Sequence, residues 1–514
     1  MKIGDTMRVA ASYKNILYGF LFQFVNLIMT LLLRTVFIKY FGIELLGVQN
    51  LFLNLMGLIS IVELGLTTAL AVTLYKPIKQ NENLKLASLY ISFKKLFSII
   101  GLIIFFVSII TSLLIPYLNI NTDININYIQ STFVLYSLSI VVGYFFSVNR
   151  IFYFAFQKNS IVLKNDSIFI IMKQFTQIIF IFILNSFVLF LILEIFFSLA
   201  NNFILNKKIK LDYDFLFEKS PKVSLKEMNV WEKVKSVSIL KFVGVGVNAT
   251  DSLIISSFLS VSVNGIFSNY ALIFTYAFNY IGTFFNGILA SLGDLISENN
   301  ISNIRLYFNR LNYLSYLMAV FSTGTIYFSI NLFISKWIGV EYQLEQLSVI
   351  LLCTIHYLKV MRQINWFFTS TSGIFDGFVK VSIIELIINL ILSILLIKYI
   401  GLNGVLIGTF FASLYSWYGQ SISVHSYILK KEVSEYFKNQ LFLAAKFTLI
   451  IYFVYLINSF MEMLFSNKNE YILIFISLLC LYILIYYLDI KKNKEFVFLL
   501  NKLNSIIRRK QNVQ

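Results

Sequence analysis

Several hydrophobic segments of this 514-residue chain carry a cation well inside the segment. Arg34 interrupts NLIMTLLLRTVFI, Lys173 interrupts SIFIIMKQFTQIIFIF, and Lys241 lies in VSILKFVGVG. Lys359 and Arg362 lie together in LLCTIHYLKVMRQINWFF. A charged side chain at the centre of a bilayer costs roughly 2.5–3.5 kcal/mol on insertion scales, so it usually faces a cavity or a partner. Cations in several different segments therefore indicate an anionic substrate that crosses a membrane.

Arg and Lys are the residue types that a phosphate or pyrophosphate requires. Arg supplies a bidentate fork and Lys a movable point charge, and both replace the water that the anion loses. In the last of these segments His356, Lys359, Arg362 and Asn365 recur every three residues. This spacing predicts a polar stripe and makes the segment the strongest single phosphate-binding candidate. The interpretation fails if every cation is locked in an ion pair.

Four of these cations also have a structural explanation, and for Arg362 it is extension to the cytoplasmic interface, whereas Lys359 lies deeper. Arg34 lies toward the outer end of its segment and could extend to the headgroups. Lys173 lies near the middle, where extension is difficult, so a buried ion pair with Glu194 is the alternative. Lys241 lies nearer an inner end, where extension to the headgroups is the better explanation.

Embedded acids are candidates for coupling transport to an ion gradient, because intramembrane carboxylates can bind H⁺ or Na⁺. Asp251 is the most suggestive, since Asn248 and Ser252 could share its helical face, and Glu63 is the second candidate. The alternative is that these acids neutralise Lys173 or Arg34 between helices.

The elements that must position these residues are membrane-spanning helices. The chain is 58% hydrophobic and only 13% charged, whereas soluble domains are roughly 45–50% apolar. At about 20 apolar residues per span, the sequence predicts about fourteen spans. The least certain boundary is the tight turn near Asn185, between two adjacent spans. The predicted class is an all-α polytopic membrane protein.

The charge distribution gives the orientation. The net charge is +17, and the Lys and Arg residues concentrate in alternate loops, which places both termini in the cytoplasm. The predicted organisation is a lobe over 1–206 (spans 1–6), a cytoplasmic linker over 207–236, a second lobe over 237–428 (spans 7–12), and spans 13 and 14 over 429–490. Residues 491–514 predict a basic amphipathic helix on the inner leaflet, with a disordered basic tail as the alternative.

A weak internal repeat supports two lobes. The junction of spans one and two can be laid over that of spans seven and eight. Gly47 then falls opposite Gly265, and Arg34 falls opposite Ser252, beside Asp251. Transporters commonly bind their substrate where two such lobes meet. Chance similarity is the alternative.

The sequence carries no signature of an enzyme, a metal site or a cofactor site. No phosphate-binding glycine loop, HExxH, CxxC or nucleophile elbow occurs. The two cysteines, Cys353 and Cys480, both lie in apolar spans. A membrane-bound polymerase or ligase would need a large outer loop, and the outer loops here are short. A purely structural scaffold would not explain the deep cations. The basic charge follows from cytoplasmic loops, so no nucleic-acid partner is expected.

Two stretches of the chain resemble a known family. The N-terminal stretch has Arg34 ahead of the end of its span, the turn Phe41, Gly42, Glu44, Gly47, and the ELGL segment at Glu63–Leu66. A second stretch is GLNGVLIGT, at 401–409. Both are similar to the Wzx-type flippases of O-antigen and capsular repeat units, in the polysaccharide exporter family of the multidrug/oligosaccharidyl-lipid/polysaccharide exporter (MOP) superfamily.

The resemblance implies two six-helix lobes around a cationic cavity, with two further C-terminal helices, in the bacterial inner membrane. It implies alternating-access translocation of an undecaprenyl-pyrophosphate-linked oligosaccharide, with a polysaccharide polymerase and a chain-length regulator as candidate partners. Of the embedded cations, only Arg34 corresponds to a family position by pattern. Drug-exporting relatives typically have an acid in the first span, and Arg34 in its place counts against a cation antiporter. A flippase for the lipid-linked peptidoglycan precursor is the nearest alternative.

Overall fold

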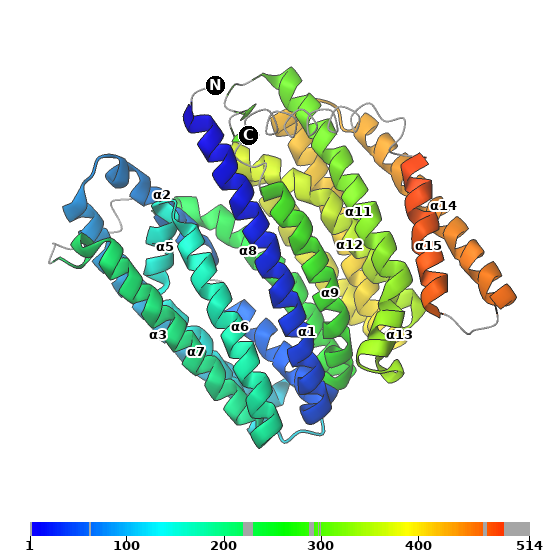
Figure 1. The fold of residues 1–514 in the computed structure, drawn as a ribbon, viewed down its shortest axis with the longest axis horizontal. Coiled ribbons are helices and arrows are strands. Elements are labelled where there is room, and N and C mark those ends of the chain that lie inside the picture. Colours follow the sequence, from blue (N-terminus) through cyan, green and yellow to red (C-terminus); the bar gives the residue numbers. More distant parts are fainter. Residues whose placement is uncertain are drawn as a thin grey trace. The chain divides into compact units, whose positions relative to one another are not determined.

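The structure of this chain is a computed structural model that describes residues 3–60, 63–218, 230–286, 292–293, 295–296, 298, 300–465 and 470–487. Every regular element in these ranges is a helix (Figure 1). The predicted all-α class is therefore confirmed for the described part of the chain. The predicted amphipathic tail, 491–514, and the middle of the predicted linker lie outside it.

The described part of the chain contains fourteen α-helices. In the first half of the chain they are α1 (Ile3–Ile59), α2 (Glu63–Lys79), α3 (Asn83–Leu114), α4 (Ile126–Tyr144), α5 (Ser147–Ala155), α6 (Asn159–Leu184), α7 (Phe187–Asp212) and α8 (Val230–Phe258). In the second half they are α9 (Val261–Asn286), α11 (Ile301–Trp337), α12 (Gln346–Ser372), α13 (Asp376–Val424), α14 (Ser434–Phe465) and α15 (Glu470–Ile485). Single helical turns occur at η2 (Ile115–Leu118), η3 (Asp214–Phe217), η5 (Val340–Tyr342) and η6 (His425–Leu429).

Nine helices among the described residues are long and apolar enough to cross a membrane. Two of them, α1 and α13, each contain two helical segments joined at a break. The fold therefore supports a polytopic membrane protein, while the count of about fourteen spans and the location of both termini stay predictions.

The breaks in α1 and α13 fall at the glycines of the two sequence motifs. Gly42 has φ 83° and ψ 167°, and Gly401 has φ 55° and ψ −135°. Residues with a Cβ rarely adopt positive φ, whereas glycine does so at little cost. These two glycines therefore let the chain end one segment and start the next without a long loop.

The tight turn between α6 and α7 is present, so the two predicted spans on either side of it are separate helices. Asn185 ends α6 in the left-handed conformation, with φ 43°, which Asn tolerates better than most residues. Ser186 then caps α7 by accepting a hydrogen bond from the backbone N–H of Leu189. Two antiparallel helices of 26 residues each result.

The chain divides into two compact units. The first contains residues 1–271 and 382–408, and the second contains residues 272–381 and 409–514. Helices α9 and α13 contribute to both units. The two lobes predicted from the sequence, 1–206 and 237–428, stay a prediction.

In the first unit, the second segment of α1 packs closely on the first turns of α9. A Cβ added to Gly47 would overlap the carbonyl oxygen of Val261, and one added to Gly265 would overlap the carbonyl oxygen of Ile43. Gly47 and Gly265 are the residues that the repeat places opposite each other. The absence of both side chains allows the two backbones to approach.

In the second unit, α11 packs along α12 and next to α15. Ser315 of α11 donates a hydrogen bond to the backbone carbonyl of Val360 on α12 at 2.9 Å. Gly324 of α11 lies against Leu481 of α15. A Cβ added to Gly324 would lie 2.5 Å from a methyl carbon of Leu481. These contacts join α11 to both α12 and α15.

Candidate functional site

Arg34 and Lys173, two of the predicted cations, line the same cavity. The cavity belongs to the first unit and has a volume of about 200 Å³. Its walls come from α1, α4, α6 and α7, with Thr30, Leu33, Arg34, Phe37, Leu46, Gln49, Asn50, Leu53, Tyr136, Lys173, Gln174, Gln177, Phe190 and Glu194. Two cations and one acid leave one excess positive charge in this lining, which favours an anionic ligand.

Arg34 is half-buried and is held by α9. Its guanidinium donates to Asn269 Oδ1 at 2.7 Å and to Ser268 Oγ at 3.1 Å. Both partners are neutral, and both are buried. A guanidinium has five N–H donors in a planar fork, so these two bonds orient the group without neutralising its charge.

Lys173 pairs with Glu194 across the α6–α7 hairpin. The ammonium lies 2.5 Å from Glu194 Oε1, with the side chains 23% and 20% exposed. Gln177, one helical turn after Lys173, donates to the other carboxylate oxygen at 3.0 Å. The structure thus contains the ion pair that the sequence offered as the alternative. A lysine ammonium has three donors, so the pair leaves Lys173 able to contact a second anion.

Asp251 is buried in the first unit, where it accepts a hydrogen bond from Asn389. Asn389 Nδ2 donates to Asp251 Oδ1 at 3.0 Å, and Asn389 Oδ1 accepts from the hydroxyl of Thr250 at 3.1 Å. Asn248 instead donates to the carbonyl of Gly244. A buried, hydrogen-bonded carboxylate is suited to bind a proton or a cation, so the predicted coupling role stays a hypothesis.

Lys359 and Arg362 belong to α12 in the second unit, and both side chains are half-buried. The predicted stripe does not lie on a single face. His356, 3% exposed, is 3.0 Å from the hydroxyl of Ser322 on α11, whereas Asn365 donates to Ser421 on α13 at 2.9 Å. Each three-residue step turns an α-helix through about 300°, so three steps place the two ends of the stripe on opposite sides. His356 and Asn365 therefore join helices.

Two predicted residues cannot be placed at side-chain level. Lys241 belongs to α8 and Glu63 is the first residue of α2, but both side chains lie outside what the structure describes. Among the described residues, no group of His, Cys, Asp and Glu could hold a metal ion.

The partners of Arg34 were not predicted from the sequence. The internal repeat could have indicated Ser268, because the alignment that places Gly47 opposite Gly265 also places Asn50 opposite Ser268. Arg34 bonds Ser268, and the repeat-equivalent pair, Ser252 and Asn50, is joined at 3.4 Å. These paired contacts support the repeat as a real structural relationship, and they place Arg34 beside the α1–α9 crossing.

Comparison with known proteins identifies the fold. No family model matches the chain, and no curated protein matches it in sequence. Solved structures do match. A lipid II flippase, MurJ, in an inward closed conformation has a TM-score of 0.65 at 17% identity, covering 92% of this chain and 99% of that one.

Other matches are transporters of the same superfamily. An inward-facing multidrug resistance transporter of the MATE family has a TM-score of 0.61 at 13% identity, covering 77% of this chain and 95% of that one. A MOP superfamily transporter from Pyrococcus furiosus has a TM-score of 0.54 at 14% identity, covering 82% and 97%. This chain therefore has the fold of MOP superfamily transporters.

Proposed function

We propose that this protein is a flippase that moves undecaprenyl-pyrophosphate-linked oligosaccharide repeat units, of an O-antigen or a capsule, from the inner to the outer leaflet of a bacterial inner membrane. The fold supports a membrane transporter, and the match to a lipid II flippase covers nearly the whole chain. The main support for a substrate with an anionic headgroup is the cavity that Arg34 and Lys173 share.

The size of this cavity fits the proposal. At about 200 Å³ it is smaller than the roughly 300–1,000 Å³ of pockets that enclose drug-sized ligands. It can take a phosphate group, but the sugars and the prenyl chain must lie outside it. Lys359, Arg362 and Lys241 are further proposed contacts of the pyrophosphate, and Asp251 or Glu63 is proposed to couple transport to H⁺ or Na⁺. A polysaccharide polymerase and a chain-length regulator are proposed partners.

Translocation in proteoliposomes, with a lipid-pyrophosphate oligosaccharide as substrate, tests the proposal. Arg34→Gln removes a charge-assisted donor worth about 1.5–3 kcal/mol, so we expect transport to fall by about 10- to 150-fold. Lys39→Gln is the matched control, because Lys39 is exposed on the same helix, and it should retain transport within about twofold. Equal activity of both variants would remove Arg34 from the substrate path.

A second candidate is a flippase for the lipid-linked peptidoglycan precursor, which the likeness to the lipid II flippase favours. Offering both lipids to the same proteoliposomes separates the two candidates. Transport of only the peptidoglycan precursor would reject the repeat-unit proposal. A multidrug or cation antiporter is less well supported, because the excess charge of the cavity lining is positive.

A further inference from the structure

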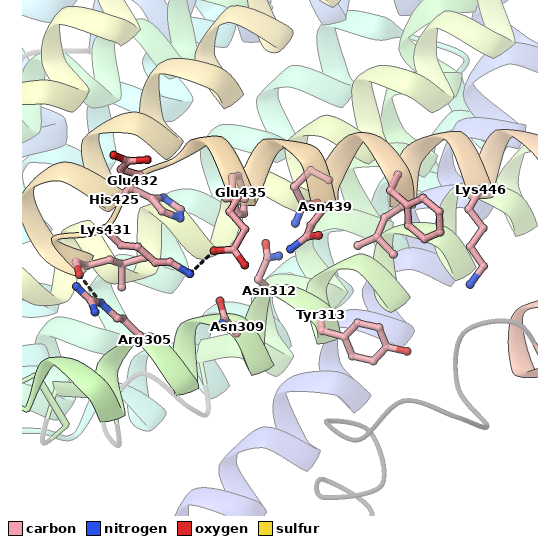
Figure 2. Close-up of a pocket in the computed structure, with 15 residues that line it drawn as sticks. Arg305, Asn309, Asn312, Tyr313, His425, Lys431, Glu432, Glu435, Asn439 and Lys446 are labelled. Carbon is pink, nitrogen blue, oxygen red and sulfur yellow. Dashed lines mark hydrogen bonds and ion pairs between the residues drawn. The ribbon is translucent and has the colours of Figure 1, made fainter.

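A second cavity, of about 530 Å³, lies in the second unit at the ends of three elements. Figure 2 shows Asn309 and Asn312 of α11 facing Glu435 and Asn439 of α14, with Arg305 and Lys431 at one end and Lys446 at the other. None of these residues was part of the candidate site above. The cavity therefore needs an explanation of its own.

The cations at the first end of this cavity are already occupied. The Arg305 guanidinium donates to the backbone carbonyls of Leu429, at 2.8 Å, and of Lys430. The Lys431 ammonium lies 2.6 Å from Glu435 Oε2. These groups close the turn between α13 and α14, so an added anion would find them partly neutralised.

Two acceptor atoms in the cavity, one on Asn312 and one on Glu435, lack a donor among the described residues. Asn312 is 8% exposed, and its Oδ1 is buried without a hydrogen-bond partner. Glu435 uses Oε2 for Lys431, and no described residue donates to its Oε1. An unsatisfied buried acceptor costs about 1–3 kcal/mol. The lining as a whole has three cations, Arg305, Lys431 and Lys446, and two acids, Glu432 and Glu435. The cavity therefore favours a zwitterionic ligand, whose ammonium brings N–H donors to Asn312 and Glu435 and whose anion lies near a cation.

An apolar groove continues from this cavity along α14. Phe442 and Lys446 line both. The groove is lined by Phe442, Ala445, Lys446, Leu449, Ile450 and Phe453 of α14 and by Leu484 of α15. The α14 residues from Phe442 to Phe453 extend about 16 Å along the helix, at about 1.5 Å per residue. This is about half of the roughly 30 Å hydrocarbon core, so the groove matches an acyl chain that fills one leaflet.

We propose that this cavity and groove bind a bilayer phospholipid with a primary-ammonium headgroup, of the phosphatidylethanolamine type. The ammonium donates to Asn312 Oδ1 and Glu435, the phosphodiester lies near Lys446 at the junction, and one acyl chain occupies the groove. The predicted cytoplasmic position of the basic loops at this end places the lipid in the inner leaflet. The lipid is a resident component and does not depend on the proposed transport function.

Native mass spectrometry of the purified full-length protein tests the proposal by comparing phosphatidylethanolamine with phosphatidylcholine. The two lipids have the same net charge, but only the first has N–H donors. We expect the wild type to bind phosphatidylethanolamine at least about tenfold more tightly. Asn312→Leu and Glu435→Gln should lose this preference, whereas Glu341→Gln, at an exposed acid in η5, should keep it.

Three results would overturn the proposal. Equal affinity of the wild type for the two lipids would mean non-selective annular binding. A preference retained in Asn312→Leu would remove the central contact; this variant should fold, because leucine replaces an unsatisfied buried amide. Competitive displacement by a lipid-pyrophosphate oligosaccharide would assign the cavity to a transported substrate. All three are binding measurements, so failure of the transport assay leaves them unaffected.

Discussion

Exchanging the charges of Lys173 and Glu194 separates a structural role of this pair from a role in binding substrate. Removal of one member of a fully buried pair costs about 3–5 kcal/mol, while an exposed pair contributes about 0–1 kcal/mol. These side chains are 23% and 20% exposed, so we expect Lys173→Met and Glu194→Gln each to lower the free energy of unfolding by about 2 kcal/mol. The exchange, Lys173→Glu with Glu194→Lys, restores the attraction. The recovery of stability in the exchange variant should be incomplete. In the wild type Gln177 donates a hydrogen bond to the carboxylate at position 194, and a lysine at that position cannot accept it.

Unfolding in mixed micelles measures the stability of these three variants and of the double variant Lys173→Met/Glu194→Gln, and the proteoliposome assay measures their transport. If Lys173 contacts the pyrophosphate, the exchange restores stability but leaves transport at least about tenfold below wild type, since the anion then meets a carboxylate at position 173. Recovery of both properties would show that the pair is only structural. If the losses of stability in the two single variants add in the double variant, the interaction energy between Lys173 and Glu194 is below about 0.5 kcal/mol. That result would refute the expected contribution of the pair to stability. The exposed pair Lys85 and Glu82 is the control, and its exchange should change stability by less than about 0.5 kcal/mol.

The remaining predictions concern the helix crossing and the buried acid. Gly47→Ala should destabilise the protein by more than about 2 kcal/mol, because its Cβ would overlap the carbonyl of Val261. Gly143→Ala is the control, because no neighbouring atom lies within 4 Å of its added Cβ. In the same unfolding assay it should be neutral or stabilising by up to about 1 kcal/mol. Asp251→Asn should retain the fold, since the amide can still accept from Asn389, and should abolish the response of transport to an imposed H⁺ or Na⁺ gradient. An unchanged gradient response would assign coupling to another group.

The secondary structure and the helix breaks could be predicted from the sequence because their causes are local. Apolar runs of span length define most of the long helices, and the only backbone groups satisfied in a bilayer core are those within helices or closed barrels. Gly42 lies in the motif that indicates a turn, and Gly401 begins the second family-like stretch; both have positive φ at the two breaks. The pairing of Lys173 with Glu194 was also accessible, because a tight turn at Asn185 makes the two spans antiparallel neighbours.

The sequence by itself determined that this chain forms membrane-crossing helices and that several of them carry cations, since hydropathy and charge are properties of each segment alone. Only the tertiary structure decided which side chains meet. Arg34 bonds Ser268 and Asn269, which lie 234 and 235 residues away, and no local pattern encodes that contact. The separation of His356 from Asn365, in contrast, follows from their spacing on one helix, because a three-residue period drifts around a helix with 3.6 residues per turn. Only the structure shows that the two side chains contact different neighbouring helices. The lining of a cavity depends on how helices cross, and close crossings depend on positions such as Gly47, where the absence of a side chain is the signal.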